Sequence, residues 1–307
     1  MNTQKAIMGK TFKRYGKNWP LYLMLLPGIV YIFIFHYIPM YGVTIAFKDF
    51  YASKGILGSP WVGLENFQRV FNSPDFLRLI WNTLSLSLYQ LILTFPIPII
   101  LALMINSSSS KKFGTFIQNL TYAPYFISTV VLVGMMLVMF STNGIANTLL
   151  KKLGMDAQLF MGEAKYFKNM FVFSSVWQTT GWSSIIYLAA LAGVNTELHE
   201  AASIDGASKL KRVLHIDFPH ILPTAVIVLT LNVGKIMSLG FEKAYLMQTT
   251  LNISVSEILS TYVYKKGLLD IDYSYSAAIG LFNNVINLVL LLSVNRVSKK
   301  LTDTGLW

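Results

Sequence analysis

Long apolar runs separated by short polar segments dominate the chain. Each of six runs is long enough to cross about 30 Å of hydrocarbon at a helical rise of about 1.5 Å per residue. They lie at 20–40, 81–105, 120–140, 170–194, 222–247 and 274–294. Several contain proline, which transmembrane bundles tolerate because neighbouring helices satisfy the freed carbonyl groups. The pattern predicts an all-α integral membrane protein with six transmembrane helices.

The composition supports a membrane protein over a soluble domain. Hydrophobic residues make up 54% of the 307 residues and charged residues only 13%, about half the charged share of a soluble chain. The net charge of +11 is spread between the apolar runs and not gathered with aromatics, which argues against nucleic-acid binding. The chain has no cysteine, which excludes disulfides, thiolate metal sites and cysteine catalysis.

Six spans place both ends of the chain on one side of the membrane. With the N-terminus inside, the inner segments hold thirteen Lys and Arg residues and the outer segments ten, a bias that favours cytoplasmic termini. We therefore expect a cytoplasmic basic N-terminus (1–19), a six-helix transmembrane domain (20–294) and a cytoplasmic tail (295–307). The run at 20–40 is interpreted as a retained anchor, since it is long and no small-x-small cleavage site follows it.

One polar island, 195–224, separates the fourth and fifth spans. Asn195 or Thr196 is suited to cap a short helix whose first turn carries an acid, the charge that the helix dipole favours there. Gly206 supplies a turn, and Ser208 is suited to cap a second, basic helix. The two prolines that follow are expected to end that second helix and lead into the next span.

The spacing in this island resembles the EAA loop of binding-protein-dependent ABC importer permeases. That pattern is Glu-Ala-Ala, three residues, Gly, nine residues and Ile-x-Leu-Pro, and Phe218 here replaces the usual Leu. The resemblance implies that the loop docks on a cytoplasmic ATPase and couples it to the spans. The residues concerned are Glu200, Ala201, Ala202, Asp205, Gly206, Ala207, Ile216 and Pro219. The alternative is an ordinary interfacial helix–turn–helix.

The resemblance extends over nearly the whole chain. Segments at 35–42, 58–67, 185–193 and 280–307 are similar to the LplB-like group of polysaccharide and oligosaccharide transport permeases. Membership implies the type I importer (MetI-like) permease fold in a bacterial cell membrane. It also implies partners of four kinds: a second homologous permease, two cytoplasmic ABC ATPase subunits, an extracytoplasmic solute-binding protein and an oligosaccharide substrate.

The same resemblance implies that the chemistry resides outside this chain. ATP and Mg would be bound by the ATPase subunits, and no cofactor or metal is expected here. The four histidines show no metal-ligand spacing, and no nucleophile–base pair is evident. We therefore expect a non-catalytic subunit that pairs with a different permease, with a homodimer as the alternative.

Polar residues inside the fourth and fifth spans recur every three to four positions and so share helix faces. One interpretation is a wet sugar path, in which amides and hydroxyls bind sugar hydroxyls and an aromatic face stacks on a ring. The candidates are Ser128, Ser175, Gln178, Thr179, Trp182, Asn232, Lys235 and Leu239. The alternative is helix–helix hydrogen bonding, which we favour for the asparagines of the last span.

Lys235 is the most informative of these candidates, because a charge inside a membrane costs about 2.5–3.5 kcal/mol on insertion scales. It could bind the carboxylate of an acidic, uronate-containing oligosaccharide. It could instead be structural, paired through Glu242 two turns along the expected helix, in which case the substrate is neutral. The sequence leaves both alternatives open.

Two other classes of membrane protein remain as rivals. An ion-coupled secondary carrier would need paired intramembrane carboxylates or an inverted repeat, and neither is visible. A structural scaffold would need neither Lys235 nor the loop around Glu200.

Overall fold

The computed structural model describes residues 18–302, 305 and 306. These residues are helical apart from turns and one isolated antiparallel bridge between Lys48 and Trp61. The expected segment 1–19 lies almost wholly outside them. In chain order the elements are α2 (Trp19–Ile32), η1 (Phe33–Tyr37), α3 (Ile38–Met40), η2 (Tyr41–Phe47), α4 (Gly55–Gly58), α5 (Glu65–Phe71), α6 (Phe76–Thr94), α7 (Pro96–Asn106), α8 (Lys111–Tyr122), η3 (Ala123–Phe126), α9 (Thr129–Met139), α10 (Ile145–Lys152), α11 (Ala164–Leu191), α12 (Thr196–Ile204), α13 (Lys209–Arg212), η4 (Val213–Asp217), α14 (Phe218–Val233), α15 (Phe241–Leu246), α16 (Ile253–Ser256), α17 (Leu259–Tyr264), η5 (Lys265–Leu269) and α18 (Tyr273–Thr302).

Each of the six expected spans corresponds to helix, but not all are simple crossings. In the described part of the chain, four helical segments are long and apolar enough to span a membrane: Trp19–Phe47, Phe76–Asn106, Lys209–Val233 and Tyr273–Lys300. A fifth crossing is possible if the bent pair Lys111–Phe126 and Thr129–Met139 counts as one span. The fourth expected span is α11, a helix of 28 residues that is long enough to cross a membrane but is not among the four apolar segments.

The third expected span, 120–140, is not one straight helix. Its two halves meet at an angle of 97°. Ile127 is extended, and the Ser128 side chain accepts a hydrogen bond from the backbone N–H of Val131 at 3.3 Å, which starts α9. A serine cap after an extended residue stops one helix and begins another in a new direction.

The fifth expected span, 222–247, is also interrupted. α14 ends at Val233, and residues 234–240 form a turn before the short α15. The expectation that Asn232, Lys235 and Glu242 share one helical face is therefore wrong. The expectation that Pro219 and Pro223 end a helix is also wrong, because α13, η4 and α14 form one continuous helical segment. Proline has no N–H to donate, and the wide π turn η4 lies just before Pro219.

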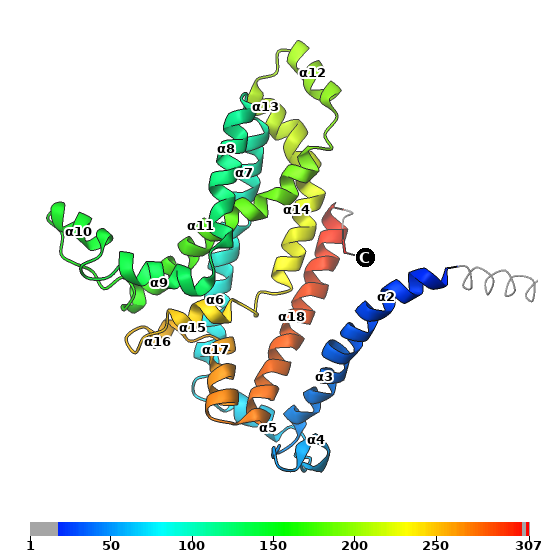
Figure 1. Cartoon of the computed structure of the whole chain (residues 1–307), viewed down its shortest axis with the longest axis vertical. Coiled ribbons are helices and arrows are strands. Elements are labelled where there is room, and N and C mark those ends of the chain that lie inside the picture. The colour runs from blue at the N-terminus through cyan, green and yellow to red at the C-terminus, as the bar shows by residue number, and fades with distance from the viewer. Residues whose placement is uncertain (1–17, 303–304, 307) are drawn as a thin grey trace, which may run out of the picture.

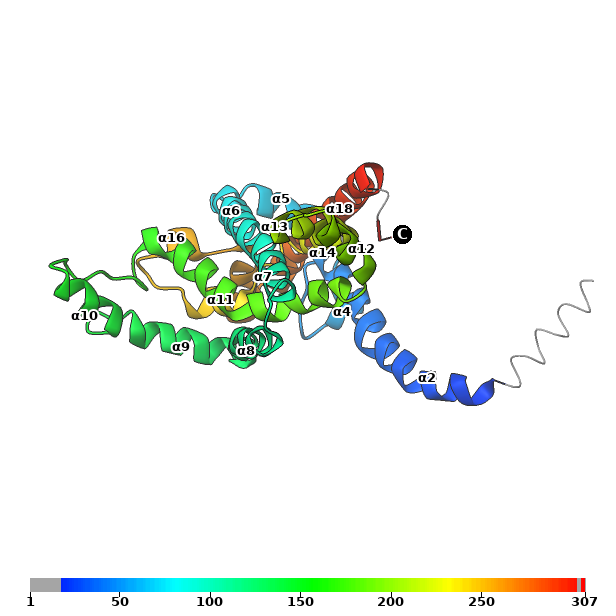
Figure 2. The same cartoon turned by 90° about the horizontal axis from the view of Figure 1, so that it is seen from above.

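The body of the protein is a bundle built around α11, which packs on α7, α6, α14 and α8 (Figure 1). α12 projects from one end, and α4 and α5 lie at the opposite end. α2 leans away from the bundle in both views (Figures 1 and 2), and none of its residues is buried. α11 and α8 approach closely at Gly181, where an added Cβ would lie 2.1 Å from the Thr121 carbonyl oxygen.

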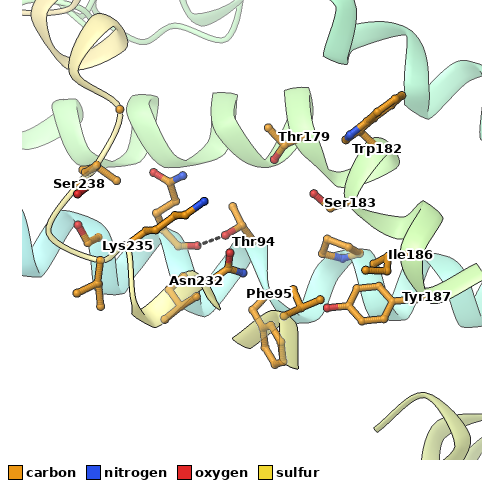
Figure 3. Close-up of a pocket in the computed structure, with 18 residues that line it drawn as sticks. Thr94, Phe95, Thr179, Trp182, Ser183, Ile186, Tyr187, Asn232, Lys235 and Ser238 are labelled. Atoms are coloured by element: carbon orange, nitrogen blue, oxygen red, sulfur yellow. Dashed lines mark hydrogen bonds between the residues drawn. The ribbon is translucent and has the colours of Figure 1, made fainter. Parts of the chain in front are cut away.

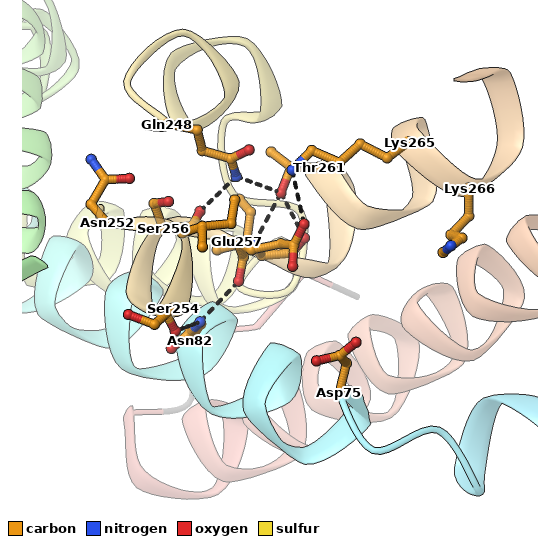
Figure 4. Close-up of polar contacts among 12 residues, drawn as sticks. Asp75, Asn82, Gln248, Asn252, Ser254, Ser256, Glu257, Thr261, Lys265 and Lys266 are labelled. Atoms are coloured by element: carbon orange, nitrogen blue, oxygen red, sulfur yellow. Dashed lines mark hydrogen bonds and ion pairs between the residues drawn. The ribbon is translucent and has the colours of Figure 1, made fainter. Parts of the chain in front are cut away.

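A buried polar cluster joins the segment between α14 and α18 to the start of α6 (Figure 4). Glu257 accepts charged hydrogen bonds from Arg78 and Lys265, both at 2.9 Å. The Asn82 amide donates to the Ser254 and Glu257 carbonyl oxygens at 2.9 and 3.0 Å. Because the carboxylate has two cationic partners, its burial is compensated and this end of the bundle is held as one unit.

Candidate functional site

A cavity of about 520 Å³ opens between α6, α7, α11 and the end of α14 (Figure 3). Its lining combines hydroxyl, amide and aromatic side chains, and Lys235 is the one charged side chain among the described residues that form it. Such a lining suits a ligand that has many hydroxyl groups and apolar ring faces. The polar and aromatic residues that line it are Ser87, Gln90, Thr94, Phe95, Thr179, Trp182, Ser183, Tyr187, Asn232, Lys235 and Ser238.

Lys235 lies in the turn after α14 and its side chain extends into the cavity (Figure 3). None of the described residues that line the cavity carries a carboxylate. Within residues 18–302, no ion pair or hydrogen bond engages the Lys235 ammonium, and it is not paired with Glu242. Lys235, which the sequence predicts inside a transmembrane helix, therefore extends into the cavity from a turn.

Two buried polar atoms on α6 also border the cavity. Ser87 Oγ and Gln90 Oε1 have no hydrogen-bond partner among the residues that the structure describes. Buried polar groups nearly always have a hydrogen-bond partner, so unpaired polar atoms at a cavity wall indicate where a ligand donates or accepts a hydrogen bond.

An aromatic stack stands at the edge of the cavity. The Trp182 ring lies parallel to Tyr125, with centroids 4.5 Å apart and 3° between the planes, and Phe126 meets it edge-on at 5.9 Å. The stack fixes the orientation of the indole ring. An apolar sugar face can therefore pack on the ring without the entropy cost of ordering a free side chain.

Five of the eight residues predicted for the substrate path border the cavity: Thr179, Trp182, Asn232, Lys235 and Leu239. The other three are engaged elsewhere. Ser128 caps α9, and the Gln178 amide donates to the Ile127 carbonyl oxygen at 2.7 Å, across the bend between α8 and α9. Ser175 is buried and accepts a hydrogen bond from the Lys243 ammonium at 2.7 Å.

Sequence reasoning missed the wall that α6 contributes. Ser87, Gln90 and Thr94 lie three and four residues apart, so they share one helical face. The second span therefore has the same periodic polar face that predicts the path residues of α11. Lys243 was also missed as the buried lysine of this region: its ammonium donates to the Phe171 carbonyl oxygen at 2.9 Å as well as to Ser175.

The last span supports the turn that carries Lys235. Asn287 on α18 accepts a hydrogen bond from the Met237 backbone N–H at 3.0 Å and donates to Ser238 at 2.9 Å. These bonds hold an irregular backbone segment beside the cavity. They agree with the interpretation of this asparagine as a helix-packing residue.

The loop around Glu200 forms the projecting helix α12 and a tight exit turn. The Asn195 side chain accepts a hydrogen bond from the Glu197 backbone N–H at 3.0 Å, as a helix cap does. Gly206 has a φ of +75°, and the N–H groups of Gly206 and Ala207 donate to the Ser203 and Ala202 carbonyl oxygens at 3.1 and 2.8 Å. This Schellman motif requires the left-handed glycine.

Six of the eight predicted coupling residues lie on α12 or in the turn that follows it, whereas Ile216 lies in η4 and Pro219 in the first turn of α14. Glu200, Ala201, Asp205 and Gly206 are exposed, and Ala202 and Ala207 are half-buried. Ser208 caps α13 as predicted, with its side chain accepting from the Lys211 backbone N–H at 3.4 Å. Among residues 18–302, no group of three or more His, Asp or Glu side chains is placed to hold a metal ion.

Comparison with known proteins identifies the family. Residues 94–303 match the sequence profile of the family described as binding-protein-dependent transport system inner membrane component. The chain belongs to this family. Its projecting loop, its cavity and its apolar helices are therefore those of a membrane subunit of a binding-protein-dependent transporter.

Two curated relatives come from Bacillus subtilis (strain 168). Protein LplB is 42% identical over 288 residues, which cover 94% of this chain and 91% of LplB. The polygalacturonan/rhamnogalacturonan transport system permease protein YteP is 41% identical over 288 residues, covering 94% and 90% of the two chains. The predicted similarity to the LplB-like group is confirmed.

Solved structures confirm the predicted fold. A chain in the crystal structure of a bacterial ABC transporter involved in the import of the acidic polysaccharide alginate superposes with a TM-score of 0.88 at 36% identity, covering 95% of this chain and 99% of that one. The alginate transporter was also solved in complex with an alginate pentasaccharide-bound periplasmic protein, with the same TM-score and identity. The chain thus has the all-α importer permease fold, and the rival class of secondary carriers is excluded.

Proposed function

We propose that this chain is the permease subunit of an ATP-driven importer for acidic, uronate-containing oligosaccharides. The observation that carries the proposal is the Lys235 ammonium, the one charged group that the described residues bring to a cavity they line without a carboxylate. An intramembrane cation needs water or an anion, and a uronate carboxylate supplies the anion. Ser87, Gln90 and Trp182 complete the site with hydroxyl, amide and ring contacts for a sugar.

Two relatives support the acidic substrate. YteP is described as a polygalacturonan/rhamnogalacturonan permease, and the solved importer carries alginate, described as an acidic polysaccharide. The alternative in which Lys235 is paired with Glu242 and the substrate is neutral has less support, because α14 ends between them. A charge-assisted hydrogen bond contributes about 1.5–3 kcal/mol, or roughly 10- to 100-fold in affinity.

The test is transport by Lys235→Met of matched neutral and uronate-containing oligosaccharides into proteoliposomes that hold the whole transporter. We expect uptake of the acidic substrate to fall at least about tenfold and uptake of the neutral one by less than about twofold. Lys235→Arg, which keeps the charge, and Lys151→Met, which removes an exposed lysine of α10, serve as controls. Equal loss of both substrates would show that Lys235 is structural.

We further propose that α12 docks on a cytoplasmic ATPase. Its exposed Glu200 and Asp205 offer acceptors for charge-assisted hydrogen bonds, and Ala201 allows close approach. ATP and Mg are bound by the ATPase subunits, so the chain itself is non-catalytic. With α12 on the cytoplasmic side, we propose that both termini are cytoplasmic. The opposite end of the bundle, with α4 and α5, then faces an external solute-binding protein like the one bound to the alginate transporter.

The second permease is proposed to be a different, homologous chain. Two ATPases that close on each other need two docking loops, and this chain offers one. The unpacked α2 leaves an apolar surface for that partner. Mass measurement of the purified complex should show one copy of this chain, one similar permease and two ATPases. A complex of this chain with the ATPase alone would establish a homodimer instead.

A further inference from the structure

The proposed coupling helix α12 makes few contacts with the rest of the bundle. None of its residues is buried, and it projects beyond the other helices (Figure 1). In the part of the chain that the structure describes, one side-chain hydrogen bond ties α12 to an element beyond its flanking turns. That bond joins His199 Nε2 to Asp217 Oδ1 at 3.0 Å.

The two partners differ in their surroundings. The Asp217 side chain is 2% exposed and that of His199 29%. A carboxylate oxygen accepts, so Nε2 of the imidazole carries the proton and donates. A buried carboxylate that loses its donor is strongly disfavoured, so the bond keeps His199, and with it α12, at a fixed position against Asp217.

Asp217 stands where α12 can act on the cavity. It is the last residue of the π turn η4, and α14 begins at the next residue. α14 then runs to Val233, with Asn232 on the cavity wall and Lys235 just beyond its end. A force applied to α12 and passed through His199 therefore reaches the base of a helix whose other end borders the substrate site.

We propose that the His199–Asp217 hydrogen bond is the brace that makes α12 and α14 move together, with His199 as a positioning residue. This rests on the proposed docking of α12 on the ATPase. Without the brace, α12 still binds the ATPase through its exposed residues, but its movement is taken up in the turns at Asn195 and Gly206. Hydrolysis then continues while transport falls.

The brace is tested by comparing transport per ATP hydrolysed in His199→Ala, Asp217→Ala and the double variant of the complete transporter. We expect this ratio to fall about tenfold in each single variant, while basal ATPase activity stays within about twofold of wild type. The double variant should be no worse than the single variants, because the effects of removing two partners of one bond are not additive. His199→Gln, which keeps a donor, should retain most of the coupling. Additive losses, or equal losses in His199→Gln and His199→Ala, would overturn the brace.

A second measurement reports on α12 without any transport. The chain has no cysteine, so a spin label on Ser203→Cys, an exposed residue of α12, gives a signal from that helix alone. We expect the label to become more mobile with His199→Ala and to be unchanged by His215→Ala. Within residues 18–302, the His215 ring bonds only to the Lys211 carbonyl oxygen of its own turn. Unchanged mobility in His199→Ala would refute the brace. Failure of the wild-type transporter to import any oligosaccharide would instead count against the proposed function and leave the label result standing.

Discussion

Replacing Gly206 by valine is expected to abolish at least about nine-tenths of transport while the protein still inserts and binds its partners. Gly206 has a φ of +75°, and nothing lies within 4 Å of an added Cβ. The cost is therefore conformational and not steric, about 1–2 kcal/mol for an ordinary residue and more for a β-branched one. The measurement is transport per ATP hydrolysed in proteoliposomes.

Gly206→Asn is the matched control for this variant. Asparagine adopts the left-handed conformation far more readily than valine, so the Schellman turn at the end of α12 should persist and transport should stay near the wild-type rate. Normal transport by Gly206→Val would show that the turn does not couple the ATPase to the spans.

Gly181→Ala is expected to destabilise the folded bundle by about 1–3 kcal/mol or more, the usual cost of overpacking. The new Cβ would lie 2.1 Å from the Thr121 carbonyl oxygen and 2.4 Å from its carbon, both backbone atoms. α8 and α11 would have to separate, which also displaces Thr179 and Trp182 from the cavity wall. Thermal unfolding of the purified complex measures the loss.

Gly134→Ala provides the comparison. Gly134 also lies in a helix, α9, but nothing is within 4 Å of its added Cβ. Alanine favours helix over glycine by about 1 kcal/mol, so this variant should be neutral or slightly stabilised. Equal unfolding temperatures for the two variants would contradict the close packing of α8 on α11.

Features set by local chemistry were predictable from the sequence. Asn195 and Ser208 cap helices, and Gly206 forms the turn between them, because each acts through bonds to residues two to five positions away. The same holds for Thr179 and Trp182, which share a helical face that the 3.6-residue period specifies. The spacing of the coupling loop also indicates the family, because the whole motif lies within one contiguous stretch of the chain.

Features set by tertiary contacts were not predictable. The run 222–247 remains apolar across the break after Val233, so hydropathy concealed the turn that carries Lys235. Ser175 has the spacing of a path residue, yet Lys243 approaches it from α15 and fixes it as a buried acceptor. Lys243 is buried because α15 packs on α9 and α17 in a position from which this side chain reaches α11, whereas Lys235 enters the cavity. The periodicity of the sequence carries no information on that packing.

The end of α14 at Val233 has an electrostatic consequence for Lys235. The last carbonyl groups of a helix carry roughly half a negative charge in total, and Lys235 follows two residues after this helix end. This negative end of the helix dipole lies beside the turn that carries Lys235, where it is expected to offset part of the positive charge that the cavity presents to an anionic substrate. A conducting site must attract its cargo and also release it. If Lys235 binds a uronate as proposed, the helix end at Val233 is expected to weaken that binding and so to favour release of the sugar.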